Sequence, residues 1–315
     1  MPTGVDGRPG VRHSASVSLR AKVKNALDEA RILVLGTQVL LGFQYRAFFE
    51  PAFERLSPLN QSLELAGLLL LLGTMGLVLL PAARHRLVER GEDTPDLHHF
   101  TMDAMGLALF PFAVVMGLDL FQAGSTRGPR LAIALGLATF AMAILFWFGS
   151  GLVIGRRPGQ AEEREEMKIE DKITQVLTEA RVVLPGAQAL FGFQLAMTLM
   201  EGYERLPASS QDMHLAATCA IALTIVLLMA PPAYHRIVER GEDTERFHRF
   251  ASWMVLAAMA TLPLGFAGEL WIVVRKQTGS IAQAHAAGIG ALVFFYGLWF
   301  CAMLVLRARR PQNAA

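Results

Sequence analysis

The sequence is poor in charge and has almost no cysteine. Only 18% of its 315 residues are charged, whereas about a quarter is usual in a soluble domain. The formal net charge is +2, so there is no basic excess of the kind that binds nucleic acid. The two cysteines, Cys219 and Cys301, both lie inside apolar segments. This placement argues against a disulfide framework and indicates small buried side chains.

Motifs for catalysis are also missing. The sequence has no nucleotide-binding loop, no spacing typical of a catalytic triad and no paired-cysteine metal site. We therefore expect no enzyme activity, no cofactor and no bound metal. The N-terminal segment lacks the apolar core of a signal peptide, and we interpret residues 1–20 as a disordered cytoplasmic tail.

Long apolar runs dominate what is present, since 53% of the residues are hydrophobic. About 20 apolar residues of helix cross a hydrocarbon core about 30 Å thick. The sequence therefore predicts an all-α polytopic membrane protein with eight transmembrane helices. A soluble helical bundle is excluded because the runs have hardly any polar face. The runs cover residues 32–49, 63–83, 101–121, 131–154, 182–200, 213–233, 251–274 and 283–306.

The chain repeats itself after 150 residues. The run from His85 to Thr94 returns from His235 to Thr244, and only Leu87, replaced by Ile237, differs. Such a match indicates a tandem duplication. Each copy holds four runs, an even number, so we expect two parallel four-helix repeats related by a pseudo-two-fold axis along the membrane normal. The expected units are repeat 1 at 21–156, a cytoplasmic linker at 157–172 and repeat 2 at 173–310.

Lysine and arginine gather on one side of the predicted membrane. They are frequent after the second and fourth runs of each copy and sparse after the first and third. Because short cytoplasmic loops carry an excess of these residues, the rich side is predicted to be cytoplasmic. Both termini lie on that side. The predicted location is the inner (plasma) membrane, with the lipid bilayer as the first partner.

Four acidic residues are candidates for ion transport. Asp119 and Glu269 lie late in the third run of their copies, and Glu269 is about 8–9 Å inside the helix end. Intramembrane carboxylates are costly and often functional, and burial suits them to proton exchange. The alternative is that they reach the interface or pair with a loop arginine. Glu29 and Glu179, at the inner mouth, are candidates for a gate or for interface anchors.

Glutamines recur in the first helix of each copy. Gln38 and Gln44 return as Gln188 and Gln194. Their amide oxygens could line a polar path or coordinate an ion. The alternative is that they form hydrogen bonds between helices and stabilise the bundle, which nearby glycines would allow by close helix approach.

A short hairpin on the predicted cytoplasmic side forms the last candidate site. Gly91 suits a helix C-terminus, and Thr94 followed by Pro95 suits the start of the next helix. A tight helix–turn–helix therefore explains much of this motif. The histidines could also bind a metal, ligate haem, sense pH or contact a cytoplasmic protein. The residues concerned are His85, Arg86 and His98, which return as His235, Arg236 and His248.

Each copy resembles an uncharacterised bacterial family of four-helix integral membrane proteins. The resemblance covers residues 21–156 and 171–310. Members usually hold one unit, so this chain resembles a fused dimer, and they are often labelled sodium:proton antiporters. Repeat 1 departs further from the pattern, so if one half has lost a role, we expect it to be repeat 1. The residues that carry the resemblance are Glu179-Ala180-Arg181, Pro185-Gly186-x-Gln188, Leu190-Phe191-Gly192-Phe193, Pro231 to Arg236, Asp119 and Glu269.

Two functions follow as hypotheses. The first is a proton-coupled transporter of monovalent cations, in which Asp119 and Glu269 carry protons and the glutamines line the path. The second is a membrane scaffold or sensor that does not transport and acts through its cytoplasmic hairpins. A polar cavity that reaches Glu269 and the glutamines would favour the first, and a fully packed bundle would favour the second.

Overall fold

The structure, a computed structural model, describes residues 19–125, 127–154, 169–239, 242 and 244–309. Only the backbone is described at 19–32, 149–154, 169–176 and 179–182. Most of the expected N-terminal tail (1–20) and most of the expected linker (157–172) lie outside the described residues, and the described ends of both segments are helical. Within the described part, the chain forms helices and turns, with no β-strand.

Helices follow the apolar runs closely. Repeat 1 contains α1 (Leu19–Ala47), the short turn η1 (Phe53–Arg55), α2 (Pro58–Val78), α3 (Leu80–Leu87), α4 (Pro95–Ser125) and α5 (Pro129–Ile154). Repeat 2 contains α6 (Ile169–Met197), α7 (Glu201–Glu204), α8 (Ala208–Ile237), α9 (Glu245–Thr278), α10 (Ile281–Tyr296), the π-helical turn η2 (Gly297–Cys301) and α11 (Ala302–Arg309).

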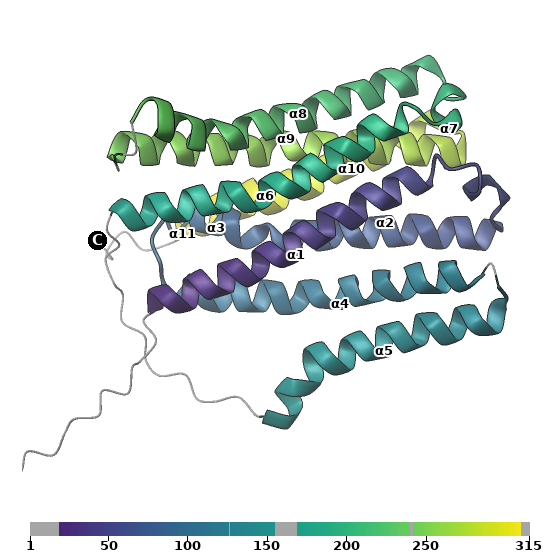
Figure 1. Cartoon of the computed structure of the whole chain (residues 1–315), viewed down its shortest axis with the longest axis horizontal. Helices are drawn as coiled ribbons and strands as arrows, with labels where there is room; N and C mark the ends of the chain where they lie inside the picture. Colours follow the sequence, from purple (N-terminus) through teal and green to yellow (C-terminus); the bar gives the residue numbers. More distant parts are fainter. Residues whose placement is uncertain (1–18, 126, 155–168, 240–241, 243, 310–315) are drawn as a thin grey trace, which may run out of the picture.

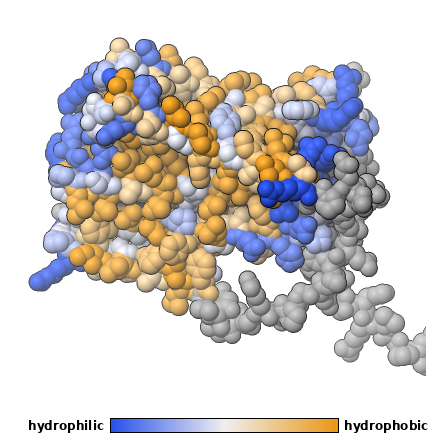
Figure 2. All heavy atoms as spheres, turned by 180° about the vertical axis from the view of Figure 1, so that it is seen from behind, coloured by the Kyte–Doolittle hydropathy of each residue, from blue (hydrophilic) through white to orange (hydrophobic). Residues whose placement is uncertain are grey.

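Six helical rods are long and apolar enough to cross a membrane. They are α2 with α3, α4, α5, α8, α9, and α10 with α11. The predicted number of eight is therefore supported for six. The other two, α1 and α6, begin with charged turns, and α6 has a shorter apolar stretch, Val183–Met197. Figure 2 shows a broad hydrophobic band across one face, with hydrophilic residues at both ends.

The first helices of the two repeats, α1 and α6, pack against each other at the centre (Figure 1). The α8–α9 pair lies on one side of them and the α4–α5 pair on the other. The start of α1 and the end of α11 lie at the same end of the bundle, which we call the terminal end. At the opposite end, the far end, α1 leads into α2 and α6 leads through α7 into α8.

The fourth helices of the two repeats are placed differently. The α10–α11 rod packs on α9 and also on α3 of repeat 1, whereas α5 makes its main contacts with α4. The indole of Trp299 is fully buried and donates to the carbonyl oxygen of Gly76 at 2.9 Å. A side chain at Gly76 would collide with Phe294, so this glycine allows the close approach. Repeat 2 carries an exposed Val226 at the equivalent position of α8.

The helices that follow the two hairpins at the terminal end, α4 and α9, begin with the predicted N-caps. The hydroxyl of Thr94 accepts from the backbone N–H of Leu97 at 3.1 Å, and α4 begins at Pro95. Thr244 caps α9 in the same way at 3.1 Å. Helix α3 ends at Leu87 with Val88 as its C-cap, so Gly91 lies in the turn and not at the helix end that the sequence predicted. Its φ of 87° is a left-handed conformation that glycine adopts without strain. The predicted helix–turn–helix is therefore confirmed in repeat 1.

Candidate functional site

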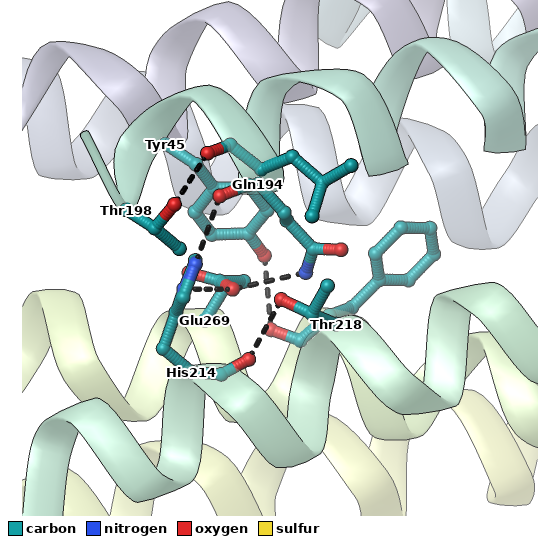
Figure 3. A network of polar contacts seen from close by, with 8 residues as sticks. Tyr45, Gln194, Thr198, His214, Thr218 and Glu269 are labelled. Atoms are coloured by element: carbon teal, nitrogen blue, oxygen red, sulfur yellow. Dashed lines mark hydrogen bonds and ion pairs between the residues drawn. The ribbon is translucent and has the colours of Figure 1, made fainter.

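A buried cluster of three polar side chains lies inside repeat 2. Gln194 comes from α6, His214 from α8 and Glu269 from α9, and their side chains converge in Figure 3. The Nδ1 atom of His214 lies 2.8 Å from Oε1 of Glu269, and the amide of Gln194 donates to the same oxygen at 2.9 Å. These three residues are 0–1% exposed. We call them the repeat 2 site.

The hydrogen-bond partners of His214 define its protonation. Its Nε2 atom lies 3.0 Å from the carbonyl oxygen of Gln194, which can only accept, so Nε2 carries a proton. Its Nδ1 atom faces the carboxylate. One further proton between Nδ1 and the carboxylate leaves the pair neutral overall, whichever atom holds it. The repeat 2 site therefore places two titratable side chains within hydrogen-bond distance of each other.

Further polar and aromatic groups surround this pair. The hydroxyl of Thr218 donates to the backbone oxygen of His214 at 2.8 Å, and the ring of Tyr203 stands 5.2 Å from the imidazole. Burial raises the pKa of the Tyr203 hydroxyl, and the charges of Asp212 and Glu269 raise it further. Tyr203 therefore stays neutral beside the pair. Tyr45 reaches across from α1 and donates to the carbonyl oxygen of Phe266 at 2.9 Å (Figure 3).

Repeat 1 holds the same arrangement, displaced by 150 residues. Gln44 of α1, Glu64 of α2 and Asp119 of α4 occupy the positions of Gln194, His214 and Glu269. The amide of Gln44 donates to Oδ1 of Asp119 at 3.1 Å. We call Gln44, Glu64 and Asp119 the repeat 1 site.

The repeat 1 site borders a small polar cavity of about 10 Å³. Gln44, Glu64, Asp119 and Gln122 line it. Glu64 and Asp119 each lie six residues from the far end of their helices, which is about 9 Å inside. Two carboxylates therefore face one cavity, where repeat 2 has an imidazole and a carboxylate.

Sequence reasoning found two members of each site and missed the third. Glu64 and His214 differ in type, so they did not stand out as a repeated pair. One signal was nevertheless present, because both are titratable residues at matching positions, six residues after the start of α2 or α8, where the apolar run of each helix begins. The observed polar contacts of Glu269 are with His214 and Gln194, which differs from the alternative of a loop arginine.

The other two glutamines do not join these sites. Gln38 is fully buried and packs against Gly186 of α6, where any added side chain would collide with its amide. Gln188 is exposed on the surface of α6. Of the four predicted glutamines, Gln44 and Gln194 therefore belong to the two sites, whereas Gln38 and Gln188 have different surroundings from each other. Glu29 and Glu179 lie in α1 and α6, but their side chains are outside those described.

The repeat 1 hairpin is buried and engages the other repeat. His85 is 1% exposed, and its Nε2 atom lies 4.0 Å from the carboxylate of Asp93. Arg86 donates to the hydroxyl of Ser252 in α9 at 3.1 Å. The ring of His98 stands 5.6 Å from that of His99. These contacts give the hairpin a structural role between repeats.

The repeat 2 hairpin is more open. His235 packs its ring 4.8 Å from that of Phe247 and is half-buried, whereas Arg236 is exposed. His248 lies near Gly91 of the first hairpin and is also half-buried. Among the described residues, no group of three or more histidine, cysteine or acidic side chains could hold a metal ion.

Comparison with known proteins gives one match. Residues 15–150 and residues 162–303 each match the same family, which is described as a family of unknown function (DUF6328). The two matches together cover most of the chain and confirm the tandem duplication. No curated protein and no solved structure matches the chain. The match carries no activity, so the antiporter label stays an expectation.

Proposed function

Because the chain belongs to this family of unknown function and carries it twice, we propose its activity from the two polar sites. It is a multi-pass protein of the inner membrane, with both termini cytoplasmic, that exchanges protons for a monovalent cation. The observation that carries this proposal is the duplicated site itself. Each repeat places a carboxylate, a glutamine and a second titratable side chain within otherwise apolar helices.

The two sites have different roles in the proposed exchange. The His214–Glu269 pair is closed and holds one proton in a well-made hydrogen bond. At the repeat 1 site, Glu64 and Asp119 face one cavity and repel each other when both are charged. Either a proton or a cation relieves that repulsion, and the two compete for the same oxygens. Such competition is the physical basis of exchange.

The test uses purified protein in liposomes that contain a pH-sensitive dye. Na⁺ and K⁺ gradients are applied to the wild type and to the double variant Asp119→Asn, Glu269→Gln. The matched control is Asp103→Asn, which changes an exposed carboxylate of α4. We expect a cation-driven pH change in the wild type and the control, and none in the double variant. A wild-type signal no larger than that of empty liposomes would remove the exchange proposal.

A specific observation supports a second candidate, a scaffold or sensor. Next to Arg236 in the repeat 2 hairpin, Ile237 is 75% exposed and Val238 is 55% exposed. Exposed apolar residues beside a charge at the terminal end fit a protein partner. A photocrosslinker placed at position 238 in living cells tests this candidate, with buried Val88 as the matched control. If position 238 gives no crosslinked adduct that position 88 lacks, the scaffold or sensor candidate is contradicted.

A further inference from the structure

An apolar cleft of about 470 Å³ lies between α2, α4 and α5 in repeat 1. Among its lining residues are Leu63, Leu118, Phe121, Leu137 and Phe140. Sites for small organic ligands have volumes of about 300–1,000 Å³ and mostly apolar walls. The cleft is therefore large enough for a hydrocarbon group.

This cleft adjoins the polar cavity of the repeat 1 site. Leu63 and Leu118 line both, so the hydrocarbon-lined cleft and the cavity that holds the two carboxylates lie next to each other. Gln44 is only 5% exposed and lines the cavity, yet its Oε1 atom finds no hydrogen-bond partner among the described residues. The amide of Gln122 in the same cavity also finds none within that part of the chain. These buried polar atoms are available to accept a hydrogen bond from, or donate one to, a group that enters the cavity, because leaving them unpaired is costly.

Repeat 2 shows why the cavity belongs to repeat 1. There, Gly265 and Gly268 bring α9 against Ile221 and Ala217 of α8, with no room for side chains. The positions of these glycines are taken in repeat 1 by Val115 and Leu118. Repeat 1 therefore lacks this pair of glycine contacts, and Leu118 instead lines the cavity beside Glu64 and Asp119.

We propose that repeat 1 binds an amphipathic primary ammonium ion, with its charged head in the polar cavity and its hydrocarbon tail in the cleft. The head donates three hydrogen bonds, and the cavity offers the carboxylates of Glu64 and Asp119 and the free oxygen of Gln44 as acceptors. A cavity of about 10 Å³ holds a group of about the size of one water molecule, which fits –NH₃⁺ and not a trimethylammonium head. The two carboxylates reject an anion of the same shape.

This inference deepens the proposed function by naming the class of cation, and it rests on that proposal only for movement across the membrane. Binding of the ammonium ion is measured separately from transport. Octylammonium is titrated into the protein in lipid nanodiscs near neutral pH, and the heat from empty nanodiscs is subtracted. Octanol, octanoate and octyltrimethylammonium provide neutral, anionic and bulky-headed controls. We expect saturable binding of octylammonium, about tenfold weaker binding of octyltrimethylammonium, and no saturable binding of the other two.

Variants separate the head from the tail. Glu64→Gln with Asp119→Asn should weaken octylammonium binding about tenfold or more, since charge-assisted hydrogen bonds are lost. Leu137→Trp fills the cleft from an exposed position, so it tests the tail without disturbing buried packing. It should weaken binding of octylammonium by a similar factor. Ile289→Trp, at the equivalent exposed position of α10, is the matched control and should bind as the wild type does.

The outcomes distinguish this inference from the proposed function. Equal binding of octylammonium and octanol, or wild-type binding by Leu137→Trp, overturns the ammonium site. Na⁺ or K⁺ exchange in liposomes would then still support transport. Saturable octylammonium binding without any exchange would instead establish the site and remove the transport proposal.

Discussion

The two repeats place the same three positions in one cluster but give them different surroundings. In repeat 2, His214, Glu269 and Gln194 bond to one another and are almost fully buried. In repeat 1, Glu64 and Asp119 line a cavity and are half-buried. Duplication has thus kept the positions and changed the chemistry. The half that departs further from the family pattern holds the site that borders a cavity.

The fourth helices show the same contrast. The α10–α11 rod is anchored to repeat 1 through Trp299 and Gly76, whereas α5 packs mainly on α4. One edge of the repeat 1 cleft is therefore formed by a helix that has few other neighbours. The comparison indicates that small differences at helix contacts decide whether a polar site is sealed or accessible.

The largest expected effect comes from His214→Leu. This change leaves the Glu269 carboxylate buried without its ionic partner, which costs about 3–5 kcal/mol of unfolding free energy. The matched variant Glu64→Leu removes one of two facing carboxylates, so it should cost less than about 1 kcal/mol or be stabilising. Unfolding in mixed micelles, followed by circular dichroism, measures both. Equal losses for the two variants would contradict the difference drawn between the sites.

Reciprocal substitutions at equivalent positions of α2 and α8 test why the fourth helices are placed differently. A Cβ atom at Gly76 would lie 2.6 Å from Phe294 Cε1 and 3.2 Å from Leu298 Cδ2. Gly76→Val should therefore destabilise the protein by about 1–3 kcal/mol through overpacking. The reciprocal Val226→Gly changes an exposed position and should cost about 1 kcal/mol or less, from helix propensity alone.

Unfolding experiments on Gly76→Val and Val226→Gly check this difference in the placement of the fourth helices. In addition, the fluorescence of Trp299 should change only in Gly76→Val, because its indole bonds to the Gly76 backbone. Substitution of the other tryptophans isolates this signal. An unchanged Trp299 spectrum in a destabilised Gly76→Val protein would mean that the α2–α10 contact is not the site of damage.

Much of the fold could be predicted from hydropathy and repetition. Each of the eight apolar runs lies largely within one helical rod, because apolar periodicity and length are local properties. The caps at Thr94 and Thr244 were equally local. The position of α5 relative to α10 was not predictable, since it depends on tertiary contacts such as that between Gly76 and Trp299.

The candidate sites were predictable in part. Asp119, Glu269, Gln44 and Gln194 repeat with matching chemistry, so the sequence marks them. Glu64 and His214 required the three helices to be placed together first. Gln38 and Gln188 show the opposite failure, because equal residues at equivalent positions face buried and exposed surroundings. The repeat pattern predicts where a residue lies along its helix, but contacts with the neighbouring repeat determine whether that residue is buried or exposed.

Substitution of the two capping threonines should lower the unfolding free energy by equal amounts. It therefore gives a reference for the comparison between the two repeats. Thr94→Ala and Thr244→Ala each remove a side-chain acceptor for a backbone N–H at the start of α4 or α9. Each should cost about 1 kcal/mol of unfolding free energy. A much larger loss for Thr94→Ala, measured in the same mixed micelles, would show that the buried hairpin of repeat 1 adds contacts beyond the cap.

The smallest expected effect lies at the far end of the bundle. Arg205 is exposed and forms ion pairs with Glu201 at 3.0 Å and with Glu54 of the other repeat at 3.9 Å. Exposed ion pairs contribute about 0.2–1 kcal/mol, and salt screens them. Arg205→Ala should therefore lower the unfolding free energy by no more than that, and the loss should vanish at high salt. Arg55→Ala at the equivalent exposed position is the control, because the described residues give Arg55 no ion pair. A larger loss that persists at high salt would mean that the contact to Glu54 locks the repeats together, and the difference between them would then be fixed at their interface as well as within each site.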